Sequence, residues 1–197
     1  MKILQFMIIN LSHQILKTLP YWLIKFLSFP IGIIYFLITF RSSFRLYKRK
    51  DLFNNSGLFY NPLLVKINYT RYWLETLWLT NKNFKKYISP YIEIENQDFV
   101  NKLKKQYPGL IFALPHQGNW EFAIPIGNSI NLNLLAVAEP LDNTYVLNWF
   151  KSLRESLGIE IIIGGKGQNT FDSLVEKLNS GKDICLLSER SIKKSGV

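Results

Sequence analysis

The second half of the chain alternates short apolar runs with longer segments of mixed polarity. Each apolar run has the length of a buried strand, and each mixed segment is long enough for a helix. Strands that alternate with helices in this way pair in parallel, so the pattern predicts an α/β fold with a central, mostly parallel sheet flanked by helices. The expected strands are 109–114, 132–138, 159–163 and 183–188, and the expected helices are 120–126, 144–157 and 170–179.

The first half of the chain is predicted to be helical, with one further strand. Residues 91–95 alternate in polarity as a half-buried strand does, and residues 54–61 are rich in turn-forming side chains. We therefore place N-terminal membrane-associating helices in residues 1–53 and an α/β domain in residues 54–197. The expected helices of this half are 3–19, 26–40, 62–80 and 98–106.

The N-terminal segment is both apolar and basic. Residues 26–40 form a run of fifteen positions without a charge, and residues 1–50 contain eight Lys or Arg and no acidic residue. Basic residues beside such an apolar run favour an anionic membrane surface over a nucleic acid, and each contributes about 1 kcal/mol near a bilayer. We expect membrane association and no nucleic-acid partner. The alternative is a pair of core helices, against which the absence of acids argues.

Two modes of membrane binding fit this segment. A span needs about 20 predominantly apolar residues, so residues 26–40 are of borderline length, and Pro30 and Gly32 would kink the helix. If the segment spans, the basic residues 41–50 place the following domain in the cytoplasm. If it lies in the interface, as residues 3–19 are expected to, the domain sits on the same leaflet.

His116 and Glu121 stand on either side of a turn between the expected strand 109–114 and the next helix. On one helix, two side chains five residues apart would not face each other, but across a strand-to-helix turn they can converge. An imidazole can accept a proton from a hydroxyl at neutral pH, and a carboxylate in the first turn of a helix can orient that imidazole. The pair suits direct transfer, in which an acceptor hydroxyl attacks an activated carbonyl. The plainer alternative is a structural histidine.

The string His-Gln-Gly-Asn-Trp-Glu at residues 116–121 resembles the His-x4-Asp/Glu motif of the bacterial lipid A and phosphatidylinositol mannoside acyltransferases, which are related to the glycerolipid acyltransferases. The resemblance implies that His116 is the general base and that Glu121 orients and stabilises it. Asn119 and Trp120 are expected to shape the turn and to line the substrate site. The resemblance covers most of the chain from about Tyr69 onward.

A second block of the same family is similar to residues 137–158. Glu139 follows an expected strand and Arg154 lies on the next helix, as the matching residues of the family do. The resemblance places both in the pocket, with Arg154 set for a phosphate or for the developing oxyanion. The backbone amides of Gly118 and Asn119 are alternative oxyanion donors. Without the resemblance, Glu139 and Arg154 form a surface ion pair worth about 0–1 kcal/mol.

The third block is similar to residues 186–197, where the family usually has an acid-Arg-acid run ahead of Gly-Val. Glu189 and Arg190 match this run, whereas Ser191 replaces the second acid. Glu189 and Arg190 are therefore expected to help position the acceptor or the donor. The chain stops at Val197, inside this block, so we expect it to be incomplete at the C-terminus. A sheet that ended with strand 183–188 would leave that strand as an unpaired edge.

The resemblance implies a membrane-associated acyltransferase that moves a fatty acyl chain from an acyl carrier protein or coenzyme A thioester to a hydroxyl of a glycolipid. The acceptor would be a lipid A precursor or a phosphatidylinositol mannoside, and Glu139-Pro140-Leu141 leans toward the mannoside branch. The enzyme would act at the cytoplasmic face of the bacterial inner membrane, with no cofactor besides the acyl thioester. The alternative is a non-catalytic membrane-bound fragment or scaffold of that family.

Cys185 and the glycine run at residues 164–167 are expected to have structural roles. Cys185 is the one cysteine and lies in an apolar run, so we expect an inert thiol, and one Cys with two distant His predicts no metal site. The run Gly164-Gly165-Lys166-Gly167 is either a phosphate cradle or a connection between a strand and a helix. The second is favoured, since the run is not a Walker A motif.

Overall fold

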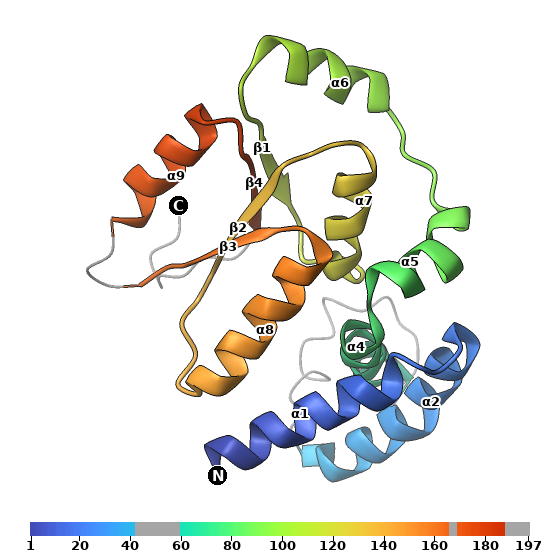
Figure 1. Ribbon diagram of the computed structural model, residues 1–197. Coiled ribbons are helices and arrows are strands. Elements are labelled where there is room, and N and C mark those ends of the chain that lie inside the picture. The colour runs from blue at the N-terminus through green and yellow to red at the C-terminus, as the bar shows by residue number, and fades with distance from the viewer. Residues whose placement is uncertain (42–59, 166–168, 188–197) are drawn as a thin grey trace. The chain divides into compact units, whose positions relative to one another are not determined.

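The computed structural model describes residues 1–41, 60–165 and 169–187 (Figure 1). The chain forms two compact units: a helical unit of residues 11–79, and a sheet unit of residues 1–10 together with residues 80–197. The predicted domain boundary after residue 53 lies outside the described residues, and so does the turn-rich joint up to residue 59. Both stay predictions.

The sheet unit is built around four parallel strands. The strands are β1 (Ile111–Leu114), β2 (Leu134–Ala138), β3 (Glu160–Ile163) and β4 (Asp183–Leu187), and their order across the sheet is β1-β4-β2-β3. This confirms the α/β fold with a parallel sheet. Because all four strands run the same way, their carboxyl ends meet at one edge of the sheet, which is where ligands bind in open α/β sheets.

Strand β4 lies in the middle of the sheet, so the expectation of an unpaired edge at residues 183–188 is wrong. Ile184 is in register with Ile111 of β1 on one side and with Leu135 of β2 on the other. The order of strands in space depends on how the chain crosses over, which the apolar pattern does not encode. After β3 the chain crosses back past β2 and inserts β4 between β2 and β1.

Helices cover both faces of the sheet. Figure 1 shows α9 (Thr170–Asn179) on the side opposite to α7 (Ala123–Ser129) and α8 (Thr144–Leu157), as right-handed crossovers require when the chain reverses its direction across a sheet. α8 and α9 confirm the expected helices, whereas α7 begins three residues later than the helix expected at 120–126. The core between α7, α8 and the sheet is apolar. Its buried side chains include Ile124, Leu134, Leu153, Leu157 and Ile161.

The strand expected at residues 91–95 is wrong. The chain there forms a 3-10 turn, η2 (Ser89–Tyr91), and then an irregular stretch that leads into α6 (Gln97–Gln106). Pro90 has a fixed φ suited to the start of such a turn, and Asn96 adopts a left-handed conformation at φ 56° that ends the extended path. The turn follows the short helix α5 (Asn81–Tyr87).

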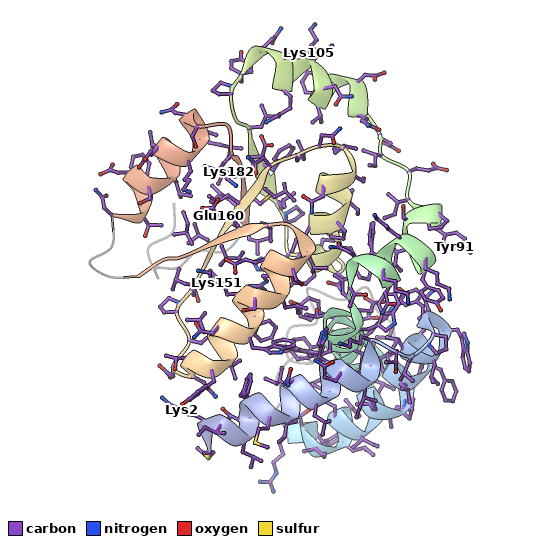
Figure 2. All side chains as sticks on the ribbon, in the orientation of Figure 1. Lys2, Tyr91, Lys105, Lys151, Glu160 and Lys182 are labelled. Carbon is purple, nitrogen blue, oxygen red and sulfur yellow. The ribbon has the colours of Figure 1, made fainter. Side chains whose placement is uncertain are left out.

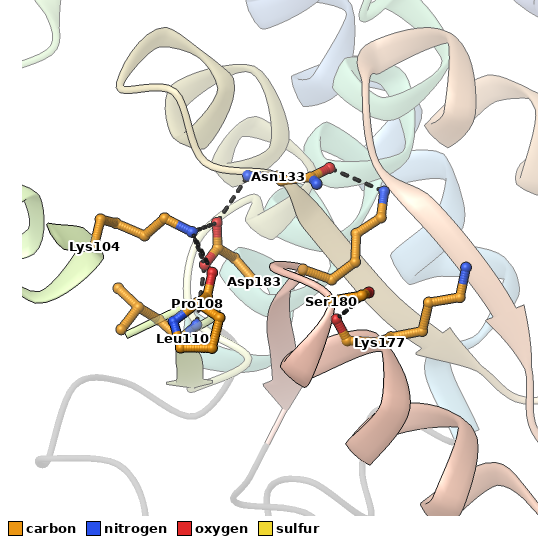
Figure 3. Close-up of polar contacts among 8 residues, drawn as sticks. Lys104, Pro108, Leu110, Asn133, Lys177, Ser180 and Asp183 are labelled. Atoms are coloured by element: carbon orange, nitrogen blue, oxygen red, sulfur yellow. Dashed lines mark hydrogen bonds and ion pairs between the residues drawn. The ribbon is translucent and has the colours of Figure 1, made fainter. Parts of the chain in front are cut away.

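A buried aspartate ties the strand starts together at the edge opposite to the carboxyl ends (Figure 3). Asp183 is fully buried and accepts hydrogen bonds from Lys104 Nζ at 2.8 and 3.0 Å. It also accepts from the backbone N–H groups of Leu110 at 3.0 Å and Asn133 at 2.8 Å, just ahead of β1 and β2. One carboxylate therefore aligns the starts of three strands, and its charge is compensated by Lys104.

The helical unit packs α2 (Tyr21–Ile38) against α4 (Tyr60–Trp78), which confirms the helices expected there. α1 (Lys2–Leu16) begins in the sheet unit and ends in the helical unit. A Cβ added to Gly32 would lie 2.7 Å from the Cα of Ile67, so this glycine lets the two backbones approach closely. At the end of α4, Trp78 is fully buried and donates from Nε1 to the carbonyl oxygen of Leu19 at 2.9 Å.

Much of the apolar surface of α2 is exposed. Its buried stripe consists of Ile24, Ser28, Gly32 and Phe36, and only 22% of the helix is buried. Among the described residues, α2 is the one helix that is long and apolar enough to cross a membrane. The exposed apolar side chains of α2 include Trp22, Phe26, Phe29, Ile34, Leu37 and Ile38.

Candidate active site

The predicted catalytic histidine lies on the loop that leaves β1 at the carboxyl edge of the sheet. β1 ends at Leu114, and His116 is exposed two residues later. The backbone N–H of Gln117 donates to the carbonyl oxygen of Pro115 at 2.8 Å, and Gly118 turns the chain at φ +65°. The position at the end of a strand confirms the expected strand-to-turn placement of His116.

Asn119 shapes the turn by capping the helical segment after it. Its Oδ1 accepts from the backbone N–H of Glu121 at 3.2 Å, and its carbonyl oxygen accepts from the N–H of Phe122 at 3.1 Å. These bonds start the 3-10 turn η3 (Trp120–Phe122), which runs directly into α7. Glu121 thus lies in a 3-10 turn rather than in the first turn of an α-helix. Its backbone is fixed by the cap ahead of it.

Glu121 is buried, and its carboxylate is held by Arg154. The side chain of Glu121 is 1% exposed and that of Arg154, on α8, is 17% exposed. Arg154 Nη2 lies 2.7 Å from Oε1 of Glu121, and Arg154 Nε lies 3.2 and 3.1 Å from Oε1 and Oε2. The guanidinium therefore grips the carboxylate as a fork, which fixes its plane as well as its position.

Two aromatic rings hold the guanidinium of Arg154. Its Cζ lies 4.6 Å from the ring centroid of Trp120 and 5.6 Å from that of Phe150, which is one helical turn earlier on α8. A guanidinium against such rings gains cation–π attraction while it keeps its donors in the plane of the fork. Trp120 therefore orients Arg154, and Arg154 in turn orients Glu121.

The pairing of Arg154 with Glu121 is a feature that sequence reasoning missed. The sequence predicts that Arg154 faces a substrate phosphate, an oxyanion or Glu139, and it gives no role to Phe150. The available signal was the spacing on α8, because residues four apart on a helix share a face and an aromatic residue can flank an Arg there. The partner on η3 comes from a different segment of the chain, which no local pattern reveals.

The other predicted site residues follow the remaining strands. Glu139 is exposed directly after β2 and so shares the carboxyl edge of the sheet with His116. β4 ends at Leu187, and the predicted residues Glu189 and Arg190 lie outside the described residues. The structure therefore brings Trp120, Glu121 and Arg154 into contact, whereas the contact of Glu121 with His116 stays a prediction.

The glycine run at residues 164–167 and Cys185 add no further residue to the candidate site. The backbone N–H of Gly164 donates to the carbonyl oxygen of Ala138 at 2.9 Å, while Lys166 and Gly167 lie outside the described residues. Cys185 is half-buried on β4, and its burial raises the pKa of the thiol to about 11, so the thiol form dominates at neutral pH. Within the described parts of the chain, no three His, Cys, Asp or Glu side chains gather as metal ligands would.

Comparison with known proteins points to one family. Residues 66–197 match the family model described as bacterial lipid A biosynthesis acyltransferase. The phosphatidylinositol mannoside acyltransferase of Mycobacterium tuberculosis (strain CDC 1551 / Oshkosh) is 31% identical over 132 residues, which are 66% of this chain and 42% of the relative. That of Mycolicibacterium smegmatis (strain ATCC 700084 / mc(2)155) is 31% identical over 134 residues, 66% of this chain and 43% of the relative. The chain thus spans less than half the length of these curated relatives.

Proposed function

The chain belongs to the family of bacterial lipid A biosynthesis acyltransferases, and we propose that it carries out acyl transfer in envelope lipid synthesis. The donor is a fatty acyl thioester of acyl carrier protein or coenzyme A, and the acceptor is a hydroxyl of a glycolipid. The observation that carries this proposal is the His116 loop at the carboxyl edge of the sheet, followed at once by the buried and clamped Glu121.

In the proposed reaction, His116 acts as general base. The imidazole takes the proton of the acceptor hydroxyl while the oxygen of that hydroxyl attacks the thioester carbonyl. The tetrahedral intermediate collapses, the C–S bond breaks, and the imidazolium returns the proton to the leaving thiolate. A new ester and a free thiol result, so no redox partner or metal is needed to balance the step.

Glu121 orients the imidazole and stabilises the imidazolium in this scheme. A buried carboxylate is well suited to that role, because its interaction with a cation is screened less than at the surface. Arg154 fixes the direction of the carboxylate through two nitrogens. We assign Arg154 as a positioning residue that acts through Glu121, in preference to direct contact with a phosphate. The oxyanion is assigned to the backbone N–H groups of Gly118 and Asn119.

Glu139, Glu189 and Arg190 are proposed to position the acceptor or the donor. The support for Glu139 is its exposed place after β2, at the same sheet edge as His116. For the acceptor itself we favour a mannoside, as in phosphatidylinositol mannoside, because two relatives carry that name and Glu139-Pro140-Leu141 has the form of that branch. A lipid A precursor is the competing acceptor.

Membrane association is the remaining part of the proposal. Exposed apolar side chains on α2, beside a chain segment that is basic and lacks acids up to residue 50, fit a bilayer with anionic lipids. Both a span and an interfacial position remain compatible with α2. If α2 spans, the excess of basic residues after it favours the cytoplasmic face of the inner membrane for the domain that follows, and if α2 lies in the interface, the domain stays on the same leaflet; we propose the cytoplasmic face.

The proposal is tested by following acyl transfer to glycolipid acceptors by mass spectrometry, with acyl thioesters as donors. His116→Ala is expected to lower the rate by about 10²–10⁴-fold, because a positioned base contributes that much. Lys105→Ala, an exposed change in the last turn of α6, is the matched control. Unchanged transfer by His116→Ala would refute the base. If the folded wild-type protein shows no acyl transfer and no thioester hydrolysis, that result would favour a non-catalytic scaffold.

A further inference from the structure

The last turn of α8 has four backbone carbonyl oxygens beyond the reach of a regular helical hydrogen bond, and each of them has a partner. The carbonyl oxygen of Arg154 accepts from the backbone N–H of Ile159 at 3.4 Å, and that of Glu155 accepts from the N–H of Gly158 at 3.0 Å. Gly158 adopts φ +103°, as a glycine that ends a helix commonly does. The remaining two carbonyl oxygens accept from side chains of other helices.

Two asparagines supply these side-chain donors, and each comes from a different helix. Asn81 at the start of α5 donates from Nδ2 to the carbonyl oxygen of Ser156 at 2.9 Å. Asn128 on α7 donates from Nδ2 to the carbonyl oxygen of Leu157 at 2.7 Å. The end of α8 is thus held by two matched amides, and all of these residues belong to the sheet unit. α8 can be followed in Figure 2 by its labelled Lys151.

Asn128 and Asn81 differ in what else their own helices hold. η3 carries Glu121 and runs directly into α7, so Glu121 and Asn128 lie about 10 Å apart along one continuous helical segment, at about 1.5 Å per residue. On α8, Arg154 and Leu157 lie about 4.5 Å apart along the axis by the same rise. α5 carries neither member of the pair that Glu121 and Arg154 form.

The segment of η3 and α7 therefore meets α8 at two separate polar contacts. The fork of Arg154 on Glu121 is one, and the amide of Asn128 on the carbonyl oxygen of Leu157 is the other. A single contact leaves two helices free to pivot about it, whereas a second contact about 10 Å away along α7 fixes the angle between them. Buried apolar side chains such as Ile124 add stability, but the hydrophobic effect is not directional.

Gly158 belongs to the same contact. A Cβ added at this position would overlap the side-chain amide of Asn128, so a residue with a side chain would displace that amide from Leu157. The left-handed φ of +103° also favours glycine. Backbone conformation and close approach thus both require a glycine at the point where Asn128 reaches α8.

We propose that Asn128 is a positioning residue of the candidate active site, and that its hydrogen bond to Leu157 sets Arg154 on Glu121. Loss of this bond lets α7 and α8 pivot, so the guanidinium no longer meets both carboxylate oxygens. The direction of the carboxylate is then lost, while its charge remains. The proposal rests on the proposed function for the reaction that Glu121 serves. Its new content is that the direction of this carboxylate depends on a bond at the other end of α7.

Nuclear magnetic resonance of the whole chain, with isotope-labelled arginine, tests the positioning without any reaction. The Nε–H signal of Arg154 is identified by its absence in Arg154→Lys, and its exchange with water reports how firmly the fork is closed. Asn128→Ala is expected to speed this exchange by about 3- to 10-fold, the factor that corresponds to one lost hydrogen bond. Asn128→Asp, which keeps the size of the side chain and removes the donor, should act in the same direction.

Asn81→Ala is the matched control, because it removes the same kind of bond from the neighbouring carbonyl oxygen of α8. It is expected to leave both the exchange of Arg154 and the transfer rate unchanged. Asn128→Ala should lower kcat by about 3- to 10-fold, with KM unchanged for donor and acceptor. In the Arg154→Lys background it should cause no further fall, because the fork is already lost. Far-UV circular dichroism and thermal melts establish that the asparagine variants fold.

Three outcomes overturn the inference. They are unchanged exchange of Arg154 in both Asn128 variants, an equal increase in Asn128→Ala and Asn81→Ala, and a fall in kcat by Asn128→Ala that persists in full in the Arg154→Lys background. Failure of the proposed function is distinguishable from all three. A chain that transfers no acyl group, yet shows faster exchange in the Asn128 variants alone, supports the positioning of Arg154 by Asn128 and refutes only the catalytic assignment.

Discussion

Two buried carboxylates lie at opposite edges of the sheet unit, and they are held differently. Asp183 accepts from Lys104 and from two backbone N–H groups at the strand starts, whereas Glu121 accepts the fork of Arg154, which is held by aromatic rings. A carboxylate bound to the backbone fixes strands in register. The carboxylate of Glu121 is bound to the guanidinium of Arg154, and this contact fixes the direction of the carboxylate. One edge therefore holds the strands in register, and the other carries the proposed catalytic residues.

The largest effect on stability is expected from Asp183→Ala. The change leaves Lys104 without its buried counter-charge and two N–H groups without their acceptor, so we expect a loss of about 3–5 kcal/mol in the free energy of unfolding. Urea denaturation measures it. Glu160→Ala is the control, because Glu160 pairs with Lys177 and Lys182 at the surface and exposed pairs contribute little. Equal losses in the two variants would contradict a structural role for Asp183.

Arg154→Lys is expected to have the next largest effect, and to act on catalysis more than on stability. Lysine keeps the charge but loses the two-nitrogen fork and the stacking on Trp120, so the direction of Glu121 is no longer fixed. We expect kcat to fall by about 10- to 100-fold, as for the loss of one charged hydrogen bond of about 1.5–3 kcal/mol, with KM for the acceptor little changed. A rise in KM with unchanged kcat would instead make Arg154 a substrate ligand.

Double-mutant cycles sharpen the comparison between the two ion pairs. One cycle combines Glu121→Gln with Arg154→Met, and the other combines Asp183→Asn with Lys104→Met. In each cycle we expect a coupling of about 0.5–3 kcal/mol in the free energy of unfolding. In the transfer rate, coupling is expected for the first pair alone. Coupling of the second pair in the rate per folded molecule would show that the two edges are not functionally separate.

The smallest effect concerns the pH dependence of stability. Hydrogen bonds from Lys177 and then Lys182 lower the pKa of Glu160 below its ordinary value of 4.5. A lowered pKa in the folded state adds stability that is present above pH 4.5 and is lost as the pH falls through the folded pKa. Glu160→Gln should remove this contribution, which thermal melts from pH 6 to pH 3 can detect. An unchanged pH profile would show that Glu160 does not make this contribution to stability.

The sequence predicted elements well and spatial neighbours poorly. The ranges of α8 and α9 follow from their apolar periodicity and from flanking turn residues such as Asn143 and Gly158, so they match the structure closely. The central place of β4 depends on crossovers, and the pairing of Glu121 with Arg154 joins residues 33 apart in the chain. Neither has a local signal. Residues 91–95 misled because a two-residue period does not distinguish a strand from an extended turn.

The candidate site shows the same division. The motif at residues 116–121 predicted a turn shaped by Asn119 and the strand end before His116, because both depend on neighbours in sequence. The role of Trp120 as a support for Arg154 required the fold. The local conformation of the motif could therefore be predicted from its own residues. The direction of the Glu121 carboxylate could not, because it depends on Arg154 of α8.

The role of Glu121 is tested most directly by the acyl-transfer rate of Glu121→Gln, measured per folded molecule under saturating thioester. The change keeps the shape of the side chain and removes the charge that is proposed to orient His116 and to stabilise its imidazolium. We expect the rate to fall by about 10²–10⁴-fold, close to the effect of His116→Ala, and to fall no further when the two changes are combined. A rate near that of the wild type would contradict this role of Glu121.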